Sequence, residues 1–520
     1  MSTNLKNSKY FELCRINKKY LALYFIFTLV SFLSMMTIEN YAYPFAELLI
    51  FILVFILGVF CFLYYCLHDN ELYKVVFVII LCFGLIFAFL SPICIIPDEQ
   101  EHLIRSDLTS QGILIPIPFS LNHLEDFSFI NKSNGGNFKT ISSIVNLSGN
   151  YGQTVFSTNF LNTPINYTVV EYHSAFAQNP FFGYLPQAIG IFLAKILDLN
   201  TIWMLWLGRV CNLVLYASIV AYAVKKTPIL KIPFIFIACL PLAVIHGASM
   251  SIDSIINSLA LLVIAYFLFL IKSKDKEIDN KKLLFFMLLI IILGLCKLSF
   301  IAFAFLVLFI PKNKFKDKFY YKYLAFMIII LIGLLWSKFY ATPALTYSYR
   351  SSYFIEHNVS LSGQLNFIFN HIPDSIVMLF RMPNYLEYCL SHFSFYGFPP
   401  FEYSSKFIST IYPLFLGSII FLYPHNNEIS FRDRFAGFFV MAVIFCGTYI
   451  IQLLTWTGVG GLYEIQGTQA RYFIPLIALA PFTFGVNNHS TPDDKIDKLI
   501  IVFAIEFLAA TLILTAVTFY

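Results

Sequence analysis

Residues 75–105 read VVFVIILCFGLIFAFLSPICIIPDEQEHLIR, an uncharged apolar run that ends abruptly in a dense group of ionisable side chains. The run 75–96 matches the roughly 20 apolar residues that an α-helix needs to cross the hydrocarbon core of a bilayer. Lipid offers no hydrogen-bond partners, so backbone inside it must form helices or a closed β-barrel. The absence of short alternating strands favours helices. The stretch therefore predicts a membrane helix followed by a charged segment at the lipid–water boundary.

The rest of the chain repeats this pattern. Apolar residues make up 59% of the 520 positions and charged residues only 12%, which excludes a water-soluble globule of this length. The segments predicted to be membrane helices, about thirteen with a range of roughly 11 to 14, are 21–38, 48–67, 75–96, 202–223, 229–247, 252–271, 283–296, 299–311, 321–340, 405–423, 435–455, 472–486 and 497–518. Lys297 separates two short segments, which are predicted to form a tight hairpin that does not span fully.

Basic residues predict the orientation, because short cytoplasmic loops are enriched in Lys and Arg. With the N-terminus in the cytoplasm, nearly all basic clusters fall on that side, namely those at 6–19, 225–226, 272–282, 312–318, 432–434 and 495. The apolar run 181–199 is predicted to lie on or dip into the outer surface, because counting it as a crossing would invert every later basic loop. The bias toward Lys, Asn, Ile and Phe is typical of a low-GC bacterial gene, which predicts the bacterial cytoplasmic (inner) membrane.

The predicted fold class is an all-α polytopic membrane protein with two long external loops that contain short interfacial helices. No internal repeat divides the chain further. Its parts are the N-terminal membrane helices 1–97, the first external loop 98–201, the central membrane helices 202–340, the second external loop 341–404 and the C-terminal membrane helices 405–520. The ten cysteines are scattered singly, without a disulfide framework or zinc spacing, and the net charge of +5 does not indicate a nucleic-acid surface.

The charged segment is the strongest functional signal in the sequence. Pro97 suits the first turn of a helix. A helix that begins there would carry Asp98, His102 and Arg105 on one face, at spacings of four and three residues. Glu99 would add a second carboxylate near the helix N-terminus. An interfacial cap is the ordinary interpretation of such residues, but the group is denser than a cap requires.

Two acids followed by His, just after an early span, resemble the first external loop of the GT-C superfamily of polyprenyl-phosphate-sugar glycosyltransferases. The pattern Pro-Asp-Glu-x-x-His-x-x-Arg resembles more closely a bacterial family of multispan membrane proteins of unknown function. Two further blocks resemble that family in the same order, one formed by 179–180, 183–187 and 207–209, the other by Gln466 to Pro475. The chain departs from the pattern in having one proline before Asp98, Gln-Ala-Arg in the last block, and two extra spans before the acidic motif.

The resemblance implies an inverting GT-C-like glycosyltransferase. It would move a sugar from a polyprenyl-phosphate donor, such as an undecaprenyl-phosphate-linked sugar, to a cell-surface glycan or glycolipid such as O-antigen, at the external (periplasmic) face. Direct displacement needs a base for the acceptor proton and cations for the departing phosphate. Asp98 is the predicted base, and Glu99 is predicted to orient the acceptor or to exchange that role.

The other predicted site residues follow from these two needs. The donor phosphate is assigned to Arg471, Arg209 and Lys297, with His102 and Arg105 as secondary candidates. Acceptor or sugar contacts are assigned to Tyr184, Gln187, Asp253, Gln466, Gln469 and Tyr472. Each has an ordinary interpretation as well: the two arginines as interfacial anchors, Lys297 as a hairpin-turn residue and Asp253 as a helix cap.

Two questions stay open at this point. Paired acids could hold a divalent cation, but no further acidic cluster completes such a site, so no obligatory cofactor is predicted. A transporter or flippase for a lipid-linked glycan, or a glycan polymerase or ligase, would also place charged residues in a membrane bundle. The lack of an internal repeat and the ionisable group at one face favour chemistry over transport.

Overall fold

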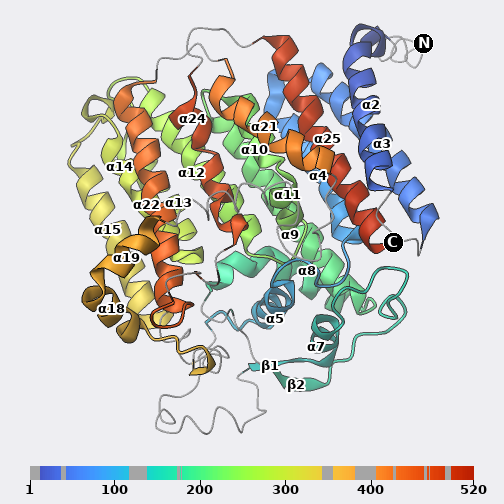
Figure 1. Cartoon of the computed structure of the whole chain (residues 1–520), viewed down its shortest axis with the longest axis horizontal. Helices are drawn as coiled ribbons and strands as arrows, with labels where there is room; N and C mark the ends of the chain where they lie inside the picture. The colour runs from blue at the N-terminus through green and yellow to red at the C-terminus, as the bar shows by residue number, and fades with distance from the viewer. Residues whose placement is uncertain are drawn as a thin grey trace.

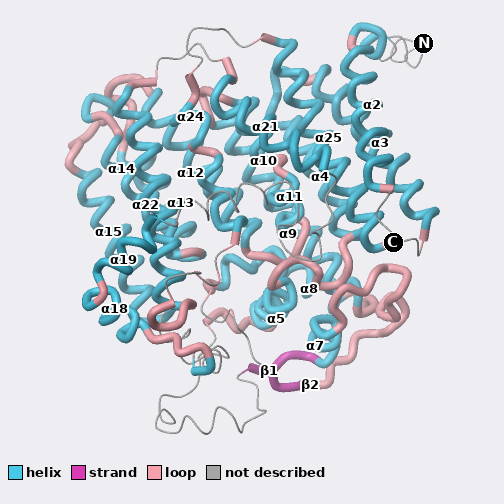
Figure 2. Tube along the Cα trace, in the orientation of Figure 1, coloured by secondary structure: helices cyan, strands magenta, loops and turns pink. Residues whose placement is uncertain are grey.

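The computed structural model describes residues 12–36, 43–115, 138–172, 176, 179–341, 355–380, 406–424, 429–461, 465, 467, 469–486 and 493–520. Most of them form a bundle of long helices (Figures 1 and 2). At the end of the bundle opposite the start of α2 lies a smaller group of elements: α5 (Glu99–Ser110), β1 (Phe138–Ile141), α7 (Ser142–Gly149), β2 (Val169–Tyr172), η3 (Phe181–Tyr184) and α8 (Leu185–Ile196).

Eight helices among the described residues are long and apolar enough to cross a membrane, which confirms a multispan helical membrane protein. They are α2 (Lys18–Met35), α3 (Pro44–Leu67), η1 (Asp69–Glu71) continued by α4 (Leu72–Leu90), α9 (Ile202–Lys226), α12 (Asp253–Lys272), α15 (Tyr321–Trp336) continued by η6 (Ser337–Ala341), α22 (Phe431–Thr455) and α25 (Asp494–Phe519). Each coincides with a segment predicted from hydropathy.

The other predicted segments are helical but shorter or broken. They are α10 (Lys231–Ala238) with α11 (Pro241–Gly247), α13 (Asn280–Cys296), η4 (Leu298–Ala304) with α14 (Phe305–Phe309), α21 (Lys406–Leu422), and η7 (Ala470–Phe473) with α23 (Ile474–Ile477) and α24 (Ala480–Phe484). Prolines at 241, 475 and 481 begin new short helices, as expected for a residue that fixes φ and lacks an N–H. Lys297 ends α13 in an extended conformation, and η4 then packs back on α13, as the predicted hairpin requires.

The interior of the bundle is built around α12 and α25. In each, 94% of the most apolar 18-residue window is buried, compared with 17% in α15 and 28% in α2. The outer helices instead expose large apolar side chains, such as Phe45, Leu49 and Ile56 on α3 and Leu324, Met327 and Leu331 on α15. Such a surface is expected where the solvent is lipid.

One polar contact joins the two ends of the chain inside the bundle. The Thr28 hydroxyl of α2 lies 2.6 Å from Oε2 of Glu506 on α25 and 2.8 Å from the carbonyl oxygen of Tyr24. The Ser31 hydroxyl donates to Oε1 of Glu506 at 3.2 Å. All of these side chains are buried, so the contact fixes α2 against α25 at a defined register.

The segment 98–201, predicted to be the first external loop, corrects the all-α prediction. Strands β1 and β2 pair antiparallel, with Phe138 opposite Tyr172 and Ile141 opposite Val169. Four residues per strand are too few to show a period of two in the sequence, so the pattern was missed. The helix predicted at 181–199 exists as η3 and α8, and it packs closely on α9: a Cβ at Gly190 would lie 2.3 Å from the Leu207 carbonyl.

The segment 341–404, predicted to be the second external loop, is described in part. Helices α18 (Leu361–Asn370) and α19 (Ile372–Phe380) form there and pack against each other, and α18 contacts α22. Residues 342–354 and 381–405, which include most of the predicted loop, lie outside the described residues.

Candidate functional site

The acidic motif begins with a change of backbone direction. After α4, the segment 91–98 turns twice, and Cys94 and Asp98 take positive φ values of 52° and 62°. Helix α5 therefore begins at Glu99, not at Pro97 as predicted. Asp residues tolerate the left-handed region better than most non-glycine residues. The consequence is that the neighbouring carboxylates of Asp98 and Glu99 meet different partners.

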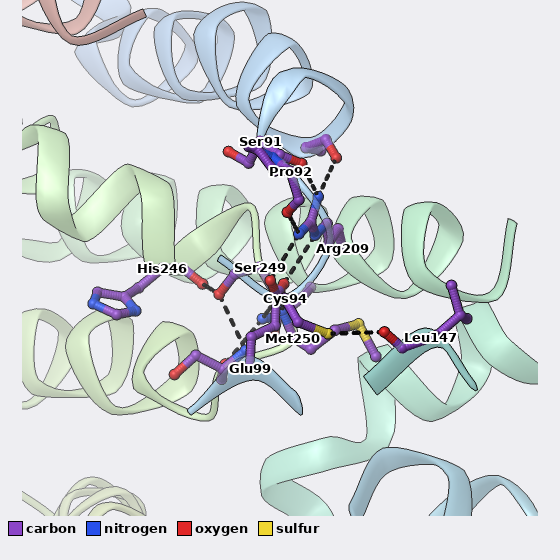
Figure 3. A network of polar contacts seen from close by, with 12 residues as sticks. Ser91, Pro92, Cys94, Glu99, Leu147, Arg209, His246, Ser249 and Met250 are labelled. Atoms are coloured by element: carbon purple, nitrogen blue, oxygen red, sulfur yellow. Dashed lines mark hydrogen bonds and ion pairs between the residues drawn. The ribbon is translucent and has the colours of Figure 1, made fainter. Parts of the chain in front are cut away.

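Glu99 forms a closed ion pair with Arg209 of α9 (Figure 3). Arg209 Nε donates to Oε1 at 2.9 Å and Nη2 donates to Oε2 at 2.7 Å, a bidentate arrangement. Both side chains have 0% exposure. The backbone N–H of Met250 donates a further hydrogen bond to Oε1 of Glu99 at 3.0 Å.

The remaining donors of Arg209 bind backbone carbonyls at the end of α4. Its Nη1 donates to Ala88 at 3.0 Å and Ser91 at 2.8 Å, and its Nη2 donates to Pro92 at 2.9 Å. A guanidinium has five N–H donors, and all five are therefore engaged inside the protein. The pair ties together α4, α5, α9 and the turn before α12.

Asp98 lies in a more open environment. Its carboxylate Oδ2 pairs with Nη2 of Arg471, the side chain of Asp98 being 40% exposed and that of Arg471 only 6%. Arg471 Nη1 also donates to the carbonyl of Pro97 at 3.0 Å. Its Nε lies 3.4 Å from Oδ2 of Asp253 but makes no hydrogen bond with any residue that the structure describes. Arg471 thus bridges two carboxylates from distant parts of the chain.

Lys297 completes this group from the break between α13 and η4. Its Nζ lies 2.9 Å from the ring centroid of Tyr472. Burial lowers the pKa of the Lys297 ammonium to about 7, although the nearby carboxylates of Asp253 and Asp98 oppose the change. We call Asp98, Asp253, Lys297 and Arg471 the Asp98 cluster. It contains two acids and two cations, and its open member is Asp98.

The carboxylate of Asp253 does not cap α12, because Ser251 takes that role. Ser251 Oγ accepts the hydrogen bond from the Asp253 backbone N–H at 3.1 Å, and no side-chain cap comes from Ile252. The cap interpretation of the Asp253 carboxylate is therefore not what the structure shows, since that carboxylate pairs with Arg471.

His102 and Arg105 support Tyr184 instead of joining the Asp98 cluster directly. His102 Nδ1 lies 2.9 Å from the Tyr184 hydroxyl, which also accepts from Asn179 at 2.9 Å. The Arg105 guanidinium lies 5.4 Å from the Tyr184 ring centroid. The guanidinium also donates to Thr109 Oγ1 at 2.7 Å and to the carbonyls of Leu114 and Asn179, both at 3.2 Å. His102 Nε2 lies 3.4 Å from Ser251 Oγ, which connects this layer to the turn before α12.

The other predicted sugar-binding residues occupy separate positions. Gln187 Nε2 donates to the carbonyls of Met250 and Ser251, both at 3.3 Å, and so holds the turn between α11 and α12. The carbonyl of Gln469 accepts from the backbone N–H of Tyr472 at 3.1 Å. Gln466 lies outside the described residues.

Sequence reasoning missed His246 at the end of α11. The side chain is fully buried, and neither ring nitrogen has a hydrogen-bond partner in the part of the chain that the structure describes. The ring points away from the Glu99–Arg209 pair (Figure 3). Its only signal in the sequence is a histidine within the otherwise apolar run 229–247.

The arrangement suits anion binding and proton transfer. Arg471 and Lys297 offer positive charge, and Asp98 offers a partly exposed carboxylate beside them. Within the described ranges, no group of three or more His, Cys, Asp or Glu side chains is placed to hold a metal ion.

Comparison with known proteins gives one match. No curated protein and no solved structure matches this chain. The model of a family described as "Predicted membrane protein (DUF2142)" matches residues 81–480 of the 520, a range that includes Asp98, Glu99, Arg209, Asp253, Lys297 and Arg471. The chain belongs to this family of predicted membrane proteins.

Proposed function

We propose that this protein is a glycosyltransferase that moves a sugar from a polyprenyl-phosphate donor to a cell-surface glycan or glycolipid, with Asp98 as general base. The observation that carries the proposal is the grouping of a half-exposed carboxylate with two cations, the buried Arg471 and the partly buried Lys297. A guanidinium and an ammonium group match a lipid phosphate, and an open carboxylate beside them matches the acceptor hydroxyl.

The chemistry is a single displacement. Asp98 takes the proton of an acceptor hydroxyl as its oxygen forms a bond to the anomeric carbon of the donor sugar. The bond from that carbon to the phosphate oxygen breaks, and the phosphate leaves with the electron pair. Arg471 and Lys297 stabilise the charge that develops on it. The attack inverts the anomeric carbon and needs no obligatory metal.

We assign Glu99 and Arg209 to the framework of the site. Every donor of Arg209 is used within the protein, so none is left for a phosphate. Glu99 is fully buried in the same pair, so it cannot readily exchange roles with Asp98. His102, Arg105 and Tyr184 form a supporting layer on the external side of the cluster.

We further propose about thirteen crossings, a cytoplasmic N-terminus and a site at the external face of a bacterial inner membrane. The group of α5, α7, β1 and β2 lies at the end of the bundle opposite the start of α2 (Figure 1). Helix α9 begins beside α8 and ends at Lys225 and Lys226, about 37 Å away at 1.5 Å per residue. These lysines mark the other end as cytoplasmic by the positive-inside rule.

The test is transfer by the full chain in proteoliposomes supplied with a panel of undecaprenyl-phosphate sugars carrying a radiolabelled hexose, with membrane glycolipid extract as acceptor. We expect label to move to the acceptor, and Asp98→Asn to slow this about 10²- to 10⁴-fold. Asp198→Asn is the matched control, because Asp198 is also a left-handed aspartate (φ 47°) but is exposed and outside the cluster.

Two results would contradict the proposal. Asp98→Asn could transfer sugar at the wild-type rate, which would remove Asp98 as the base. Alternatively, the wild-type protein could move intact labelled lipid across the bilayer without breaking the sugar–phosphate bond, which would show a flippase.

A further inference from the structure

Among the residues that the structure describes, His246 and Asn257 are two buried polar side chains near Asp253 that make no side-chain hydrogen bond. His246 has neither ring nitrogen hydrogen-bonded, and Asn257 has neither its amide nitrogen nor its amide oxygen hydrogen-bonded, in the described part of the chain. Their exposures are 0% and 2%. Buried polar groups are satisfied in the great majority of cases, so these two exceptions need a reason.

Both side chains lie on the side of the Asp98 cluster. His246 interacts electrostatically with Asp253, Arg471 and Asp98, and its ring points away from the Glu99–Arg209 pair (Figure 3). Asn257 follows Asp253 by four residues on α12, so the two share one face of that helix. The unpartnered side chains of His246 and Asn257 therefore lie on α11 and α12, further into the bundle than the Asp98 cluster.

The chemistry of these groups differs from that of the cluster. An imidazole in a buried site and an amide are neutral, and each offers both hydrogen-bond donors and acceptors. A phosphate offers acceptor oxygens and would leave the acceptor atoms of His246 and Asn257 unpaired. The cations Arg471 and Lys297 are the better partners for a phosphate. Sugar hydroxyls both donate and accept, as these two side chains and the Asp253 carboxylate require.

We propose that His246 and Asn257, together with Asp253, form a subsite that binds the hydroxyl groups of a sugar next to the Asp98 cluster. The inference rests on the proposed function, because it names the ligand chemistry of the same site. The bound sugar is either the one being transferred or part of the acceptor. The KM values for the two substrates distinguish these cases.

The experiment replaces each polar group by an apolar one of similar size, His246→Phe and Asn257→Leu, in the full chain in proteoliposomes. Removing an unpartnered buried polar group does not cost stability in the empty protein, so both variants are expected to unfold at or above the wild-type temperature. Transfer is expected to weaken about 10-fold for each hydrogen-bonding group lost. A rise in KM for the labelled lipid donor assigns the subsite to the transferred sugar, and a rise in KM for the acceptor assigns it to the acceptor.

Two controls keep the result decisive. His371→Phe changes an exposed histidine on the second external loop and is expected to leave both KM values unchanged. His246→Gln retains one donor and one acceptor and is expected to fall between wild type and His246→Phe, which also covers a failure of the phenylalanine variant to fold.

The subsite is wrong if His246→Phe and Asn257→Leu transfer sugar with wild-type kcat and KM for both substrates. That outcome would not contradict the proposed function, because the variants would still transfer sugar. Absence of transfer by the wild-type protein would instead contradict the proposed function itself. A readout independent of transfer is the thermal shift produced by millimolar free hexose, which is expected in the wild type and lost in Asn257→Leu.

Discussion

Asp98 and Glu99 are neighbours in sequence and opposites in environment. Glu99 is completely buried against Arg209, and that arginine has no donor left for any other group. Asp98 keeps 40% of its side chain exposed and pairs with Arg471, whose Nε has no hydrogen bond in the described part of the chain. The difference teaches that two neighbouring acids in a motif need not share an environment: one is closed inside the protein, and the other stays open to a ligand.

A single left-handed residue creates this difference. With φ of 62° at Asp98, the chain turns into α5 so that Glu99 enters the bundle toward α9 while Asp98 remains at the helix end. A helix extended back through Pro97 would have placed both acids in one continuous spiral. Backbone conformation at one position therefore places the buried carboxylate and the open carboxylate on different partners.

The largest effect on stability is expected from breaking the buried Glu99–Arg209 pair. Glu99→Gln leaves the Arg209 charge buried without a counter-ion and is expected to lower the free energy of unfolding by about 3 to 5 kcal/mol. Asp98→Asn removes a partly exposed pair and is expected to lower it by less than about 1 kcal/mol. Denaturant unfolding in detergent measures both. The double variant Glu99→Leu with Arg209→Met is expected to recover most of the loss. A Glu99→Gln protein as stable as wild type but inactive would instead make Glu99 catalytic.

The second largest effect is expected on donor use, when the partly exposed Asp98–Arg471 pair is broken. Arg471→Ala is expected to lower kcat/KM for the lipid donor about 10²- to 10³-fold, because it removes a preorganised donor to the leaving phosphate. Arg471→Lys keeps the charge but loses the fork that joins Asp98, Asp253 and the Pro97 carbonyl, so it is expected to restore only part of the activity. Steady-state kinetics with labelled donor checks this. The control is Arg432→Ala at the exposed start of α22, and equal losses in both variants would contradict a specific role.

A smaller effect follows from the pKa of about 7 that burial gives Lys297. The ammonium is charged below that pH and neutral above it, so attraction for the donor phosphate is present at low pH and declines as pH rises through about 7. We expect KM for the donor to rise about tenfold between pH 6 and pH 8. Lys297→Arg stays charged over this range and should flatten the profile. Lys231→Arg, at the exposed start of α10, should leave it unchanged.

The smallest effect is expected in the supporting layer. Tyr184→Phe removes the hydroxyl that contacts His102 and Asn179 and is expected to lower the free energy of unfolding by about 1 kcal/mol. The same denaturant measurement applies. A large loss of transfer without any loss of stability would instead place the Tyr184 hydroxyl in contact with substrate.

Much of the fold was readable from hydropathy, because lipid imposes a length and a composition on each crossing helix. The run 75–96 predicted α4, but the helix ends at Leu90, six residues before the predicted end. The break at Lys297 was also visible, since a charged residue interrupts an apolar helix. The breaks at Pro475 and Pro481 were not predicted, because 472–486 was expected to form one continuous helix. Strands β1 and β2 were not, because four residues carry no periodic signal.

The site was predictable in its members and not in its pairings. Asp98, Arg471, Asp253 and Lys297 were each candidates, but their meeting joins positions up to 373 residues apart. Nothing in a single sequence decides that Arg209 closes on Glu99 while Arg471 takes Asp98. That choice depends on the left-handed turn at Asp98 and on how α9 and η7 pack, which are properties of the assembled bundle.

The Thr28 hydroxyl between Tyr24 and Glu506 has a consequence for the helices at the two ends of the chain. The Thr28 hydroxyl donates a hydrogen bond to the Tyr24 carbonyl at 2.8 Å. The same hydroxyl lies 2.6 Å from Oε2 of Glu506, and the Ser31 hydroxyl donates to Oε1 at 3.2 Å. Both oxygens of the Glu506 carboxyl group therefore meet hydroxyl groups of the first helix, so the first and last helices join without leaving this buried polar group unsatisfied.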